Sequence, residues 1–370
     1  MTGMIKNQKI KDILTQICIY LFFLQGFIYF LFPDEILNPA FPFKGIKYGV
    51  LLVLLLIYLP FSKRPTVFAA FLMVILPVMH YFADNRYITI LLNYIFPISL
   101  VMLIPKMKLQ INAIKRMIMI IWICIIVMAF AEFFFFKGLF EVYADMGYRV
   151  CSIMVNPNNL AIILCLISTW FLTENQKTYK YLYLLLSFIV IEFSGSRGGV
   201  LVFLLIVFIY FVRMALDAYK KKTDKREAVL SGTFFVLSIM IHLIYKMLVD
   251  WLGMRNTINF DDLNGGRVKQ VLDFLPLLKK NLVFPCRNGF AYVDDQYFHL
   301  WIYFGLPVLV VFLIFNAYLY MKAYNNNDFT CRMLLLCLLL CGITENFLYI
   351  WPSAFIYWGV VSKIIHLKGN

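Results

Sequence analysis

The sequence has few charged residues. Asp, Glu, Lys and Arg make up 15% of the 370 residues, whereas 62% are hydrophobic, and the mean hydropathy is +0.81. A soluble globular domain carries roughly 25% charged residues, so this composition excludes an ordinary soluble fold. Several apolar runs reach the length of about 20 residues that a helix needs to cross a hydrocarbon core. The composition therefore predicts an all-α integral membrane protein.

The sequence also lacks the motifs of several common chemistries. It contains no P-loop, nucleotide-binding glycine fingerprint, zinc-ligand spacing or Asp-x-Asp metal motif, so we expect neither a metal nor another cofactor. Most of the eight cysteines lie in apolar runs, which predicts small core residues rather than disulfides. No cleavable signal peptide is evident, because the run Ile13–Phe32 is too long and lacks a small-residue cleavage site. That run predicts the first membrane span.

The apolar runs predict a polytopic helical bundle of about twelve spans in a single integral membrane domain over residues 1–370. Predicted span three is about Val67–Phe82, and predicted span ten is about Tyr297–Met321. Lys and Arg concentrate in alternate turns, including 6–11, 106–116 and 213–226. The positive-inside rule places these turns and both termini in the cytoplasm. The net charge of +14 therefore predicts membrane anchoring rather than nucleic-acid binding.

One long polar interval, Asp250–Gln296, separates predicted spans nine and ten. It far exceeds the roughly 2–8 residues that usually join two helices, so we expect a functional external, periplasmic loop. The predicted topology brings charged side chains from three segments to the same external side. These residues are Arg149, Arg197, Arg267, Arg287, Asp294 and Asp295. Because arginine matches phosphate oxygens bidentately, their arrangement predicts a basic pocket for an anionic ligand.

The segment Ser194-Gly195-Ser196-Arg197-Gly198-Gly199 lies between two apolar runs. Its glycines permit positive φ angles and close backbone approach. Arg197 falls near the start of a helix, whose free N–H groups favour an anion. The alternative is a tight turn whose arginine only reaches toward lipid head groups.

Two further polar segments accompany this one. Arg149 precedes Asn156-Pro157-Asn158, where an asparagine is expected to cap span six. Asn264-Gly265-Gly266-Arg267 precedes an amphipathic segment that is expected to lie at the membrane interface or to form a solvated surface helix.

Candidate bases follow the polar interval. Asp294 and Asp295 are adjacent carboxylates near predicted arginines, and a desolvated carboxylate can acquire the raised pKa of a general base. The alternative is a helix N-cap that interacts favourably with the helix dipole. His299 is a candidate for proton transfer or a buried polar residue.

Three glutamates add weaker candidates for the site. Glu345 lies in the last predicted external turn. Glu132 and Glu192 lie inside or near the ends of predicted spans, where a carboxylate is a functional candidate unless it only pairs with an arginine.

Four places in order resemble the bacterial O-antigen polymerase and ligase superfamily, polytopic enzymes with an extended periplasmic loop. They are Arg149 with Asn156-Pro157-Asn158, Ser194-Gly195-Ser196-Arg197-Gly198-Gly199, Gly266-Arg267, and the loop end before Gly305. The resemblance covers about residues 130–360. It implies a GT-C-like, metal-independent glycosyltransferase whose donor is an undecaprenyl-pyrophosphate-linked glycan. The family's paired catalytic arginines fall on Arg197 and Arg267, which would hold the pyrophosphate.

One departure from the family pattern distinguishes its two activities. The ligases typically carry a histidine followed by Asn, Ser or Gln, eleven residues before a glycine that opens Gly-x-x-Gly. Counting back from Gly305 gives Asp294, and Val308 occupies the second glycine position. The broken pattern favours a Wzy-type polymerase and leaves the base open between Asp294, Asp295 and His299.

The expected function is polymerisation of undecaprenyl-pyrophosphate-linked repeat units at the periplasmic face of the bacterial inner membrane, giving O-antigen or a related surface polysaccharide. Expected partners are the glycan donor and acceptor, membrane lipid and a chain-length-determinant co-polymerase. Substrate-binding candidates are Arg149, Asn156, Ser196, Arg287, Tyr292, Tyr297 and Glu345, and the sugar is expected to stack on Tyr292, Tyr297 or Trp301. The alternatives are an O-antigen ligase that transfers glycan to lipid A core, and a flippase, which would need charged residues deep along a central path.

Overall fold

The computed structural model contains helices and no strand within the residues that it describes. These are residues 2–32, 45–58, 94, 97–98, 101, 103–107, 111–136, 149–174, 178–221, 225–251, 272, 276, 283 and 294–367. The all-α prediction is confirmed over these ranges. Most of the polar interval between spans nine and ten, including Arg267, Arg287 and Tyr292, lies outside them.

Four of the described helices are long and apolar enough to cross a membrane. They are α6 (Ile111–Phe135), α9 (Arg197–Tyr219), α10 (Lys225–Trp251) and α13 (Leu306–Asn325). Three shorter apolar helices are α3 (Ile46–Tyr58), α14 (Phe329–Gly342) and α15 (Trp351–Ile365). The transmembrane character of the chain is supported, whereas about twelve spans and a GT-C-like arrangement stay predictions. Predicted span three, Val67–Phe82, lies outside the described residues.

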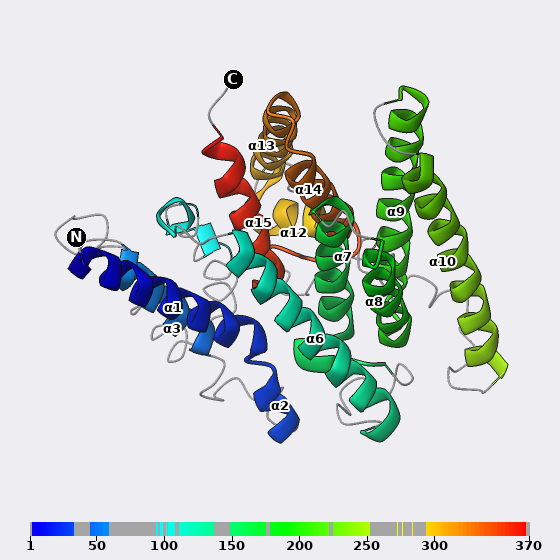
Figure 1. The fold of residues 1–370 in the computed structure, drawn as a ribbon, viewed down its shortest axis with the longest axis horizontal. Coiled ribbons are helices and arrows are strands. Elements are labelled where there is room, and N and C mark those ends of the chain that lie inside the picture. The colour runs from blue at the N-terminus through cyan, green and yellow to red at the C-terminus, as the bar shows by residue number, and fades with distance from the viewer. Residues whose placement is uncertain are drawn as a thin grey trace. The chain divides into compact units, whose positions relative to one another are not determined.

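The chain divides into two compact units, of which the first comprises Met1–Met128, Ile153–Val155 and Leu348–Asn370. It contains α1 (Thr2–Leu24), α2 (Phe27–Leu31), α3, η3 (Ile104–Lys106) and α15. Helices α1 and α3 lie side by side (Figure 1), and the hydroxyls of Thr15 and Tyr58 share a hydrogen bond of 2.5 Å between them. Helix α15 is joined to the polypeptide before η3 by a bond from the Ser362 hydroxyl to the Val101 carbonyl.

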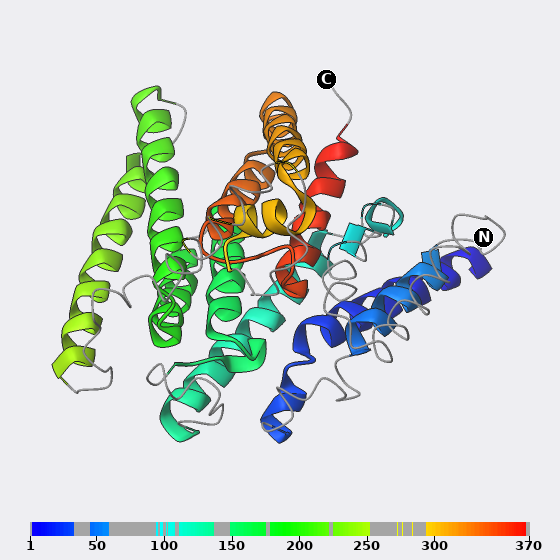
Figure 2. The ribbon, with the colours of Figure 1, turned by 180° about the vertical axis from the view of Figure 1, so that it is seen from behind.

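The second unit comprises Ala129–Ser152 and Asn156–Phe347. Its helices include α7 (Pro157–Glu174), α8 (Lys180–Ser194), α9, α10, α12 (Gln296–Phe304), α13 and α14. Helix α7 is buried along nearly its whole length because α8, α9 and α14 all pack against it, which agrees with a helix that is hydrophobic on every side. Helices α9 and α10 lie side by side in opposite views (Figures 1 and 2).

Helix α10 keeps most of its apolar side chains on the outside of the second unit. Only 17% of its most hydrophobic window is buried, and the same fraction applies to α13. Its exposed side chains include Leu243, Ile244 and Met247. Such large exposed apolar faces are unusual on soluble monomers and fit contact with lipid.

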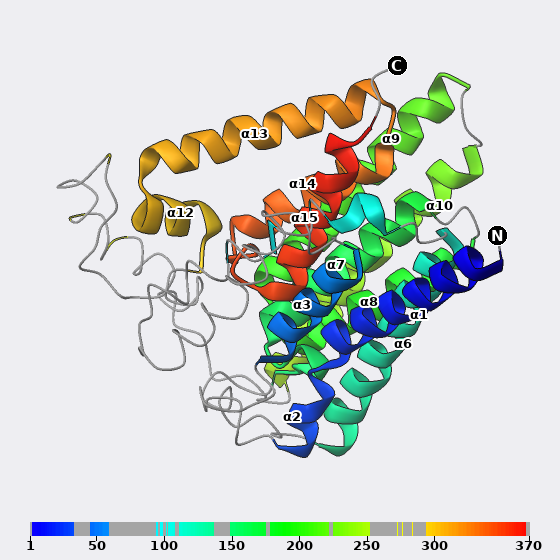
Figure 3. The same cartoon turned by 90° about the vertical axis from the view of Figure 1, so that its left-hand side faces the viewer.

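The predicted span Tyr297–Met321 is two helices rather than one, so this boundary prediction is wrong. Helix α12 ends at Phe304, Gly305 takes φ 89° and ψ 162°, and α13 begins at Leu306. Figure 3 shows the change of direction between the two helices. The break has a local cause, since Pro307 lacks an N–H and its ring cannot follow an uninterrupted helical turn. Glycine supplies the backbone conformation that the turn requires.

Candidate active site

The segment Ser194–Gly199 forms a tight connection between α8 and α9. Gly195 adopts the left-handed conformation with φ 62°, and its N–H donates to the Glu192 carbonyl at 2.9 Å. The Ser196 hydroxyl caps α9 by accepting from the Gly199 N–H at 3.3 Å. Arg197 is the first residue of α9 and is exposed. The predictions of a positive φ angle and of an arginine at a helix start are confirmed.

The two glycines after Arg197 allow α9 to begin in a crowded place. A Cβ atom on Gly198 would lie 2.6 Å from both Cβ and Oγ1 of Thr344, and one on Gly199 would overlap the Cβ of Ala161 in α7. The first turn of α9 therefore contacts α7 on one side and the polypeptide after α14 on the other. Arg197 is consequently presented by a backbone that is held from two directions.

Arg149 is held against this connection. Its Nε donates to the Ser194 carbonyl at 2.8 Å, and its Nη2 donates to Asn158 Oδ1 at 2.7 Å. The neighbouring Val150 N–H donates to the Phe193 carbonyl at 3.1 Å. Because these bonds bind the last turn of α8, they place Arg149 beside the segment that carries Arg197. Two of the three predicted arginine segments therefore meet.

Glu132, on α6, binds the residues that directly follow Arg149 and Val150. Its carboxylate is 1% exposed and accepts from the Cys151 N–H at 3.0 Å and from the Ser152 N–H at 2.6 Å. Ser152 and Val155 both have positive φ angles, of 48° and 63°, in the irregular stretch before α7. A positive φ angle is uncommon for these residue types, and for the β-branched valine it is a real outlier. Bonds from Glu132 help to fix this conformation.

Asn156 caps α7, as the sequence predicts. Its Oδ1 accepts from the N–H groups of Asn158 at 2.8 Å and Asn159 at 3.2 Å, and Pro157 is the first residue of the helix. The cap orients Asn158, whose side chain in turn accepts from Arg149. Asn156 therefore supports an arginine of the site, while its contact with substrate stays a prediction.

Asp295 acts as the N-cap of α12, which is the alternative that the sequence left open. Its Oδ1 accepts from the N–H groups of Tyr297 at 2.8 Å and Phe298 at 2.9 Å. The Tyr297 hydroxyl donates to the Leu339 carbonyl at 2.7 Å and so ties α12 to α14. Asp294 directly precedes the cap. Catalytic roles for the two aspartates stay predictions.

His299 lies in the interior of the second unit. Its side chain is completely buried, and its ring centroid lies 4.3 Å from that of Tyr303. Burial lowers the pKa of His299 to about 3, because the charged imidazolium loses its solvation. The side chain is therefore neutral at pH 7 and a weak base. The sequence left His299 open between a proton-transfer residue and a buried polar residue, and the second interpretation fits this environment better.

Glu345 directly follows Thr344, which lies against the first turn of α9. The N–H of Glu345 donates to the Cys341 carbonyl at 2.8 Å, and the residue is 5% exposed. Thr344, its neighbour, faces Gly198 at the first turn of α9. The turn after α14 therefore lies against the first turn of α9, while its external position stays a prediction.

Sequence reasoning left the partner of Glu192 open. The structure pairs its carboxylate with the imidazole of His242 on α10, with 2.8 Å between Oε1 and Nδ1. An ionisable residue inside an apolar run is the signal that marks such pairs. That signal identifies Glu192 as a candidate. His242 lies within predicted span nine, and the local sequence does not identify it as a candidate.

A buried network at the other end of α8 was also missed. Lys180 Nζ lies 2.7 Å from Glu227 Oε1 and donates to the Tyr210 hydroxyl at 3.0 Å. The hydroxyls of Tyr181 and Tyr210 donate to the same carboxylate oxygen at 2.8 and 3.0 Å. The sequence places Lys180 and Glu227 in separate basic turns, yet the network joins the first turns of α8 and α10 to α9. It is a structural feature remote in sequence from the arginines.

Comparison with known proteins gives no family assignment. No protein-family model matches the chain, and no curated protein matches it. Arg267, Arg287 and Tyr292 lie outside the described residues, so their roles stay predictions. Within the described ranges, no group of three or more His, Cys, Asp or Glu side chains is placed to hold a metal ion.

Proposed function

We propose that the protein is a membrane glycosyltransferase that polymerises undecaprenyl-pyrophosphate-linked oligosaccharide repeat units into O-antigen or a related surface polysaccharide. The reaction takes place at the periplasmic face of the bacterial inner membrane, with both termini in the cytoplasm. Donor and acceptor are both lipid-linked glycans, and a chain-length-determinant protein is the expected partner.

One observation carries the proposal: Arg149 binds the last residue of α8, three residues before Arg197 at the start of α9. Arg149 is fixed by the Ser194 carbonyl and Asn158, and Arg197 stands exposed at the N-terminus of a candidate membrane-spanning helix. Guanidinium groups and free helix N–H groups both favour a phosphate-bearing ligand. In an apolar protein, two arginines at one helix end suit the diphosphate head group of a membrane lipid.

The proposed chemistry needs stabilisation of a leaving group and removal of a proton. Cleavage of the sugar–phosphate bond develops negative charge on the lipid diphosphate, and fixed arginines stabilise that charge without needing a metal ion. The acceptor hydroxyl loses its proton to a base as it attacks the anomeric carbon. Asp294, Asp295 and His299 are the sequence candidates for that base. Arg267 is the proposed second arginine on the pyrophosphate.

A matched pair of substitutions on α9 tests the proposal. Arg197→Ala is expected to reduce polymer synthesis by roughly 10²-fold or more, because loss of one anion-stabilising donor costs about 10²–10³ in rate. Arg213→Ala, at the opposite end of the same helix, removes an exposed arginine that pairs with Asp217 at 2.7 Å and should leave synthesis unchanged. Gel ladders of product made by purified protein in liposomes give the chain length. Normal long chains from Arg197→Ala would exclude Arg197 from the mechanism, and the same test applies to Arg267→Ala.

The same assay separates the polymerase from the ligase. Purified lipid-linked repeat is supplied without lipid A core or any other acceptor. A polymerase still lengthens the chain, because a second lipid-linked repeat serves as acceptor. A ligase produces no ladder until core acceptor is added.

A flippase for lipid-linked oligosaccharide is the second candidate because two ionisable pairs, each with one buried member, join α8 to α10. Lys180–Glu227 and Glu192–His242 lie at opposite ends of α8, as charged residues along a transport path would. Translocation of a fluorescent lipid-linked glycan across the vesicle membrane, without chain growth, would favour this function over the polymerase.

A further inference from the structure

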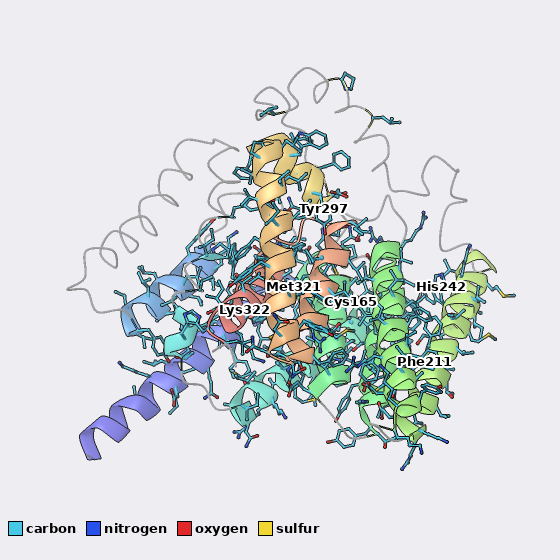
Figure 4. All side chains as sticks on the ribbon, turned by 90° about the horizontal axis from the view of Figure 1, so that it is seen from above. Cys165, Phe211, His242, Tyr297, Met321 and Lys322 are labelled. Carbon is cyan, nitrogen blue, oxygen red and sulfur yellow. The ribbon has the colours of Figure 1, made fainter. Side chains whose placement is uncertain are left out.

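The pair of Glu192 and His242 is built asymmetrically. The Glu192 side chain is 5% exposed, whereas 37% of the His242 side chain is exposed. The two side chains come from adjacent helices, Glu192 from α8 and His242 from α10, where Figure 4 labels the histidine. A buried carboxylate thus holds an imidazole that is itself partly exposed.

The hydrogen bond defines which ring nitrogen can accept a proton. An ionised carboxylate only accepts hydrogen bonds, so Nδ1 of His242 carries the hydrogen in the 2.8 Å contact with Glu192 Oε1. In the neutral ring, Nε2 is then the basic nitrogen. No described residue forms a hydrogen bond with this nitrogen. A carboxylate that orients an imidazole in this way also stabilises the imidazolium formed when Nε2 takes up a proton.

The pair lies at the same end of α8 as the arginine segment. Three consecutive carbonyls, those of residues 192–194, accept hydrogen bonds from Gly195, Val150 and Arg149 in that order. The Phe193 ring packs on the ring of Tyr245, which lies one turn after His242 on α10. The part of α10 that carries His242 is therefore packed against the last turn of α8.

The environments of Asp295 and His299 are less suited to proton transfer than that of His242. Asp295 uses a carboxylate oxygen to accept from two backbone N–H groups at the start of α12. His299 is completely buried. His242 combines an orienting carboxylate with a partly exposed side chain, and it is the better placed of the two described imidazoles in the second unit.

We propose that Glu192 and His242 form the proton-accepting pair of the active site, an inference that rests on the proposed function. As the acceptor hydroxyl oxygen forms its bond to the anomeric carbon, the hydroxyl proton moves to Nε2 of His242. The bond between the anomeric carbon and the diphosphate oxygen breaks, and its electron pair stays on the diphosphate. Glu192 is a positioning residue, which fixes the tautomer and stabilises the imidazolium.

A purely structural role makes a different prediction for one substitution. In that role, the pair would only join α8 to α10 by a hydrogen bond. Asparagine at position 242 places an N–H donor close to the position of Nδ1 for the Glu192 carboxylate but cannot act as a base at neutral pH. His242→Asn therefore retains the joining bond and removes the proposed chemistry.

The test uses purified full-length protein in liposomes with lipid-linked repeat units. His242→Asn is expected to lower kcat by about 10²-fold or more, as loss of a general base does, with KM for the lipid-linked donor unchanged. Added imidazole is expected to restore at least about tenfold activity to His242→Ala. Glu192→Gln is expected to lower kcat as well, while His366→Asn, a matched change at an exposed histidine near the C-terminus, stays at the wild-type rate.

Several outcomes would overturn the inference, and they differ from failure of the proposed function. A wild-type rate in His242→Asn, or no gain of activity in His242→Ala with imidazole, shows that the pair only joins the helices. In both cases wild-type protein still makes polymer, so the proposed function stands. A wild-type protein that makes no polymer from lipid-linked repeats refutes the function and this inference together.

Discussion

Replacing Gly198 with alanine is expected to destabilise the protein, although alanine favours a helix. The added Cβ would meet Cβ, Oγ1 and Cγ2 of Thr344 at 2.6, 2.6 and 2.8 Å, whereas carbon atoms in good contact stay about 3.5–4.0 Å apart. The first turn of α9 and Thr344 must therefore separate by about 1 Å. Overpacking of this kind costs about 1–3 kcal/mol, and better helix propensity offsets up to about 1 kcal/mol. The expected net loss is therefore about 1–3 kcal/mol without the offset and up to about 2 kcal/mol with all of it.

Gly49 provides a control of opposite sign. It also lies in a helix, α3, but a Cβ at this position meets no atom within 4 Å. Gly49→Ala should therefore gain the helix propensity alone, up to about 1 kcal/mol. Thermal unfolding in detergent compares the variants, with about 2–4 °C expected for each kcal/mol in a domain of roughly 200 residues.

A double-mutant cycle with Thr344→Gly identifies the cause. Removal of the Thr344 side chain is expected to relieve the clash, so that the Gly198→Ala loss shrinks and the two changes are non-additive by about 0.5–3 kcal/mol. A thermal unfolding midpoint that rises in Gly198→Ala, as expected for Gly49→Ala, would refute the predicted clash with Thr344. Additive changes in the free energy of unfolding would also refute it, because the crowding would then not involve Thr344.

Three further predictions concern buried polar groups. Glu132→Ala should lower stability by about 2–5 kcal/mol, since the N–H groups of Cys151 and Ser152 lose a charged acceptor, and thermal unfolding measures the loss. Lys180→Met should cost about 3–5 kcal/mol by leaving Glu227 without its ammonium partner, and adding Glu227→Gln should recover part of this loss; full stability of the single variant would contradict the ion pair. Because burial holds the pKa of His299 near 3, below the 6.5 of an exposed histidine, the unfolded chain binds more protons between these values. Stability should therefore fall as pH drops from 6.5 toward 3. The thermal unfolding midpoint of His299→Leu should fall less than that of the wild type between pH 7 and pH 4.

Local sequence signals located the caps and turns of the site well. The left-handed Gly195, the N-cap at Asn156 and the position of Arg197 at a helix start all follow from residue types at short spacing. Each of these features is decided by backbone chemistry within a few residues. The cap role of Asp295 was foreseen as an alternative for the same reason.

Partners across helices were not predictable in the same way. The bonds of Glu132 to Cys151, of Glu192 to His242 and of Lys180 to Glu227 depend on which helices pack together and at what rotation. Hydropathy alone does not contain that information, because any apolar face can meet another. The break at Gly305 was missed for a different reason, since the apolar run continues through it and masks the Gly-Leu-Pro signal.

The interruption at Gly305 separates the helical phase of α12 from that of α13. In an unbroken helix, inserting one residue turns everything beyond it by about 100°. Here the cap at Asp295 and the ring of His299 belong to α12 alone, so their orientation does not depend on the helical phase of α13. Helix α13 still packs inward through Phe312, whose ring meets those of Tyr297 and Phe347, and through buried Leu319. Substitutions on its exposed face are therefore free to accumulate in evolution, whereas an insertion that rotates α13 would disturb these inward contacts.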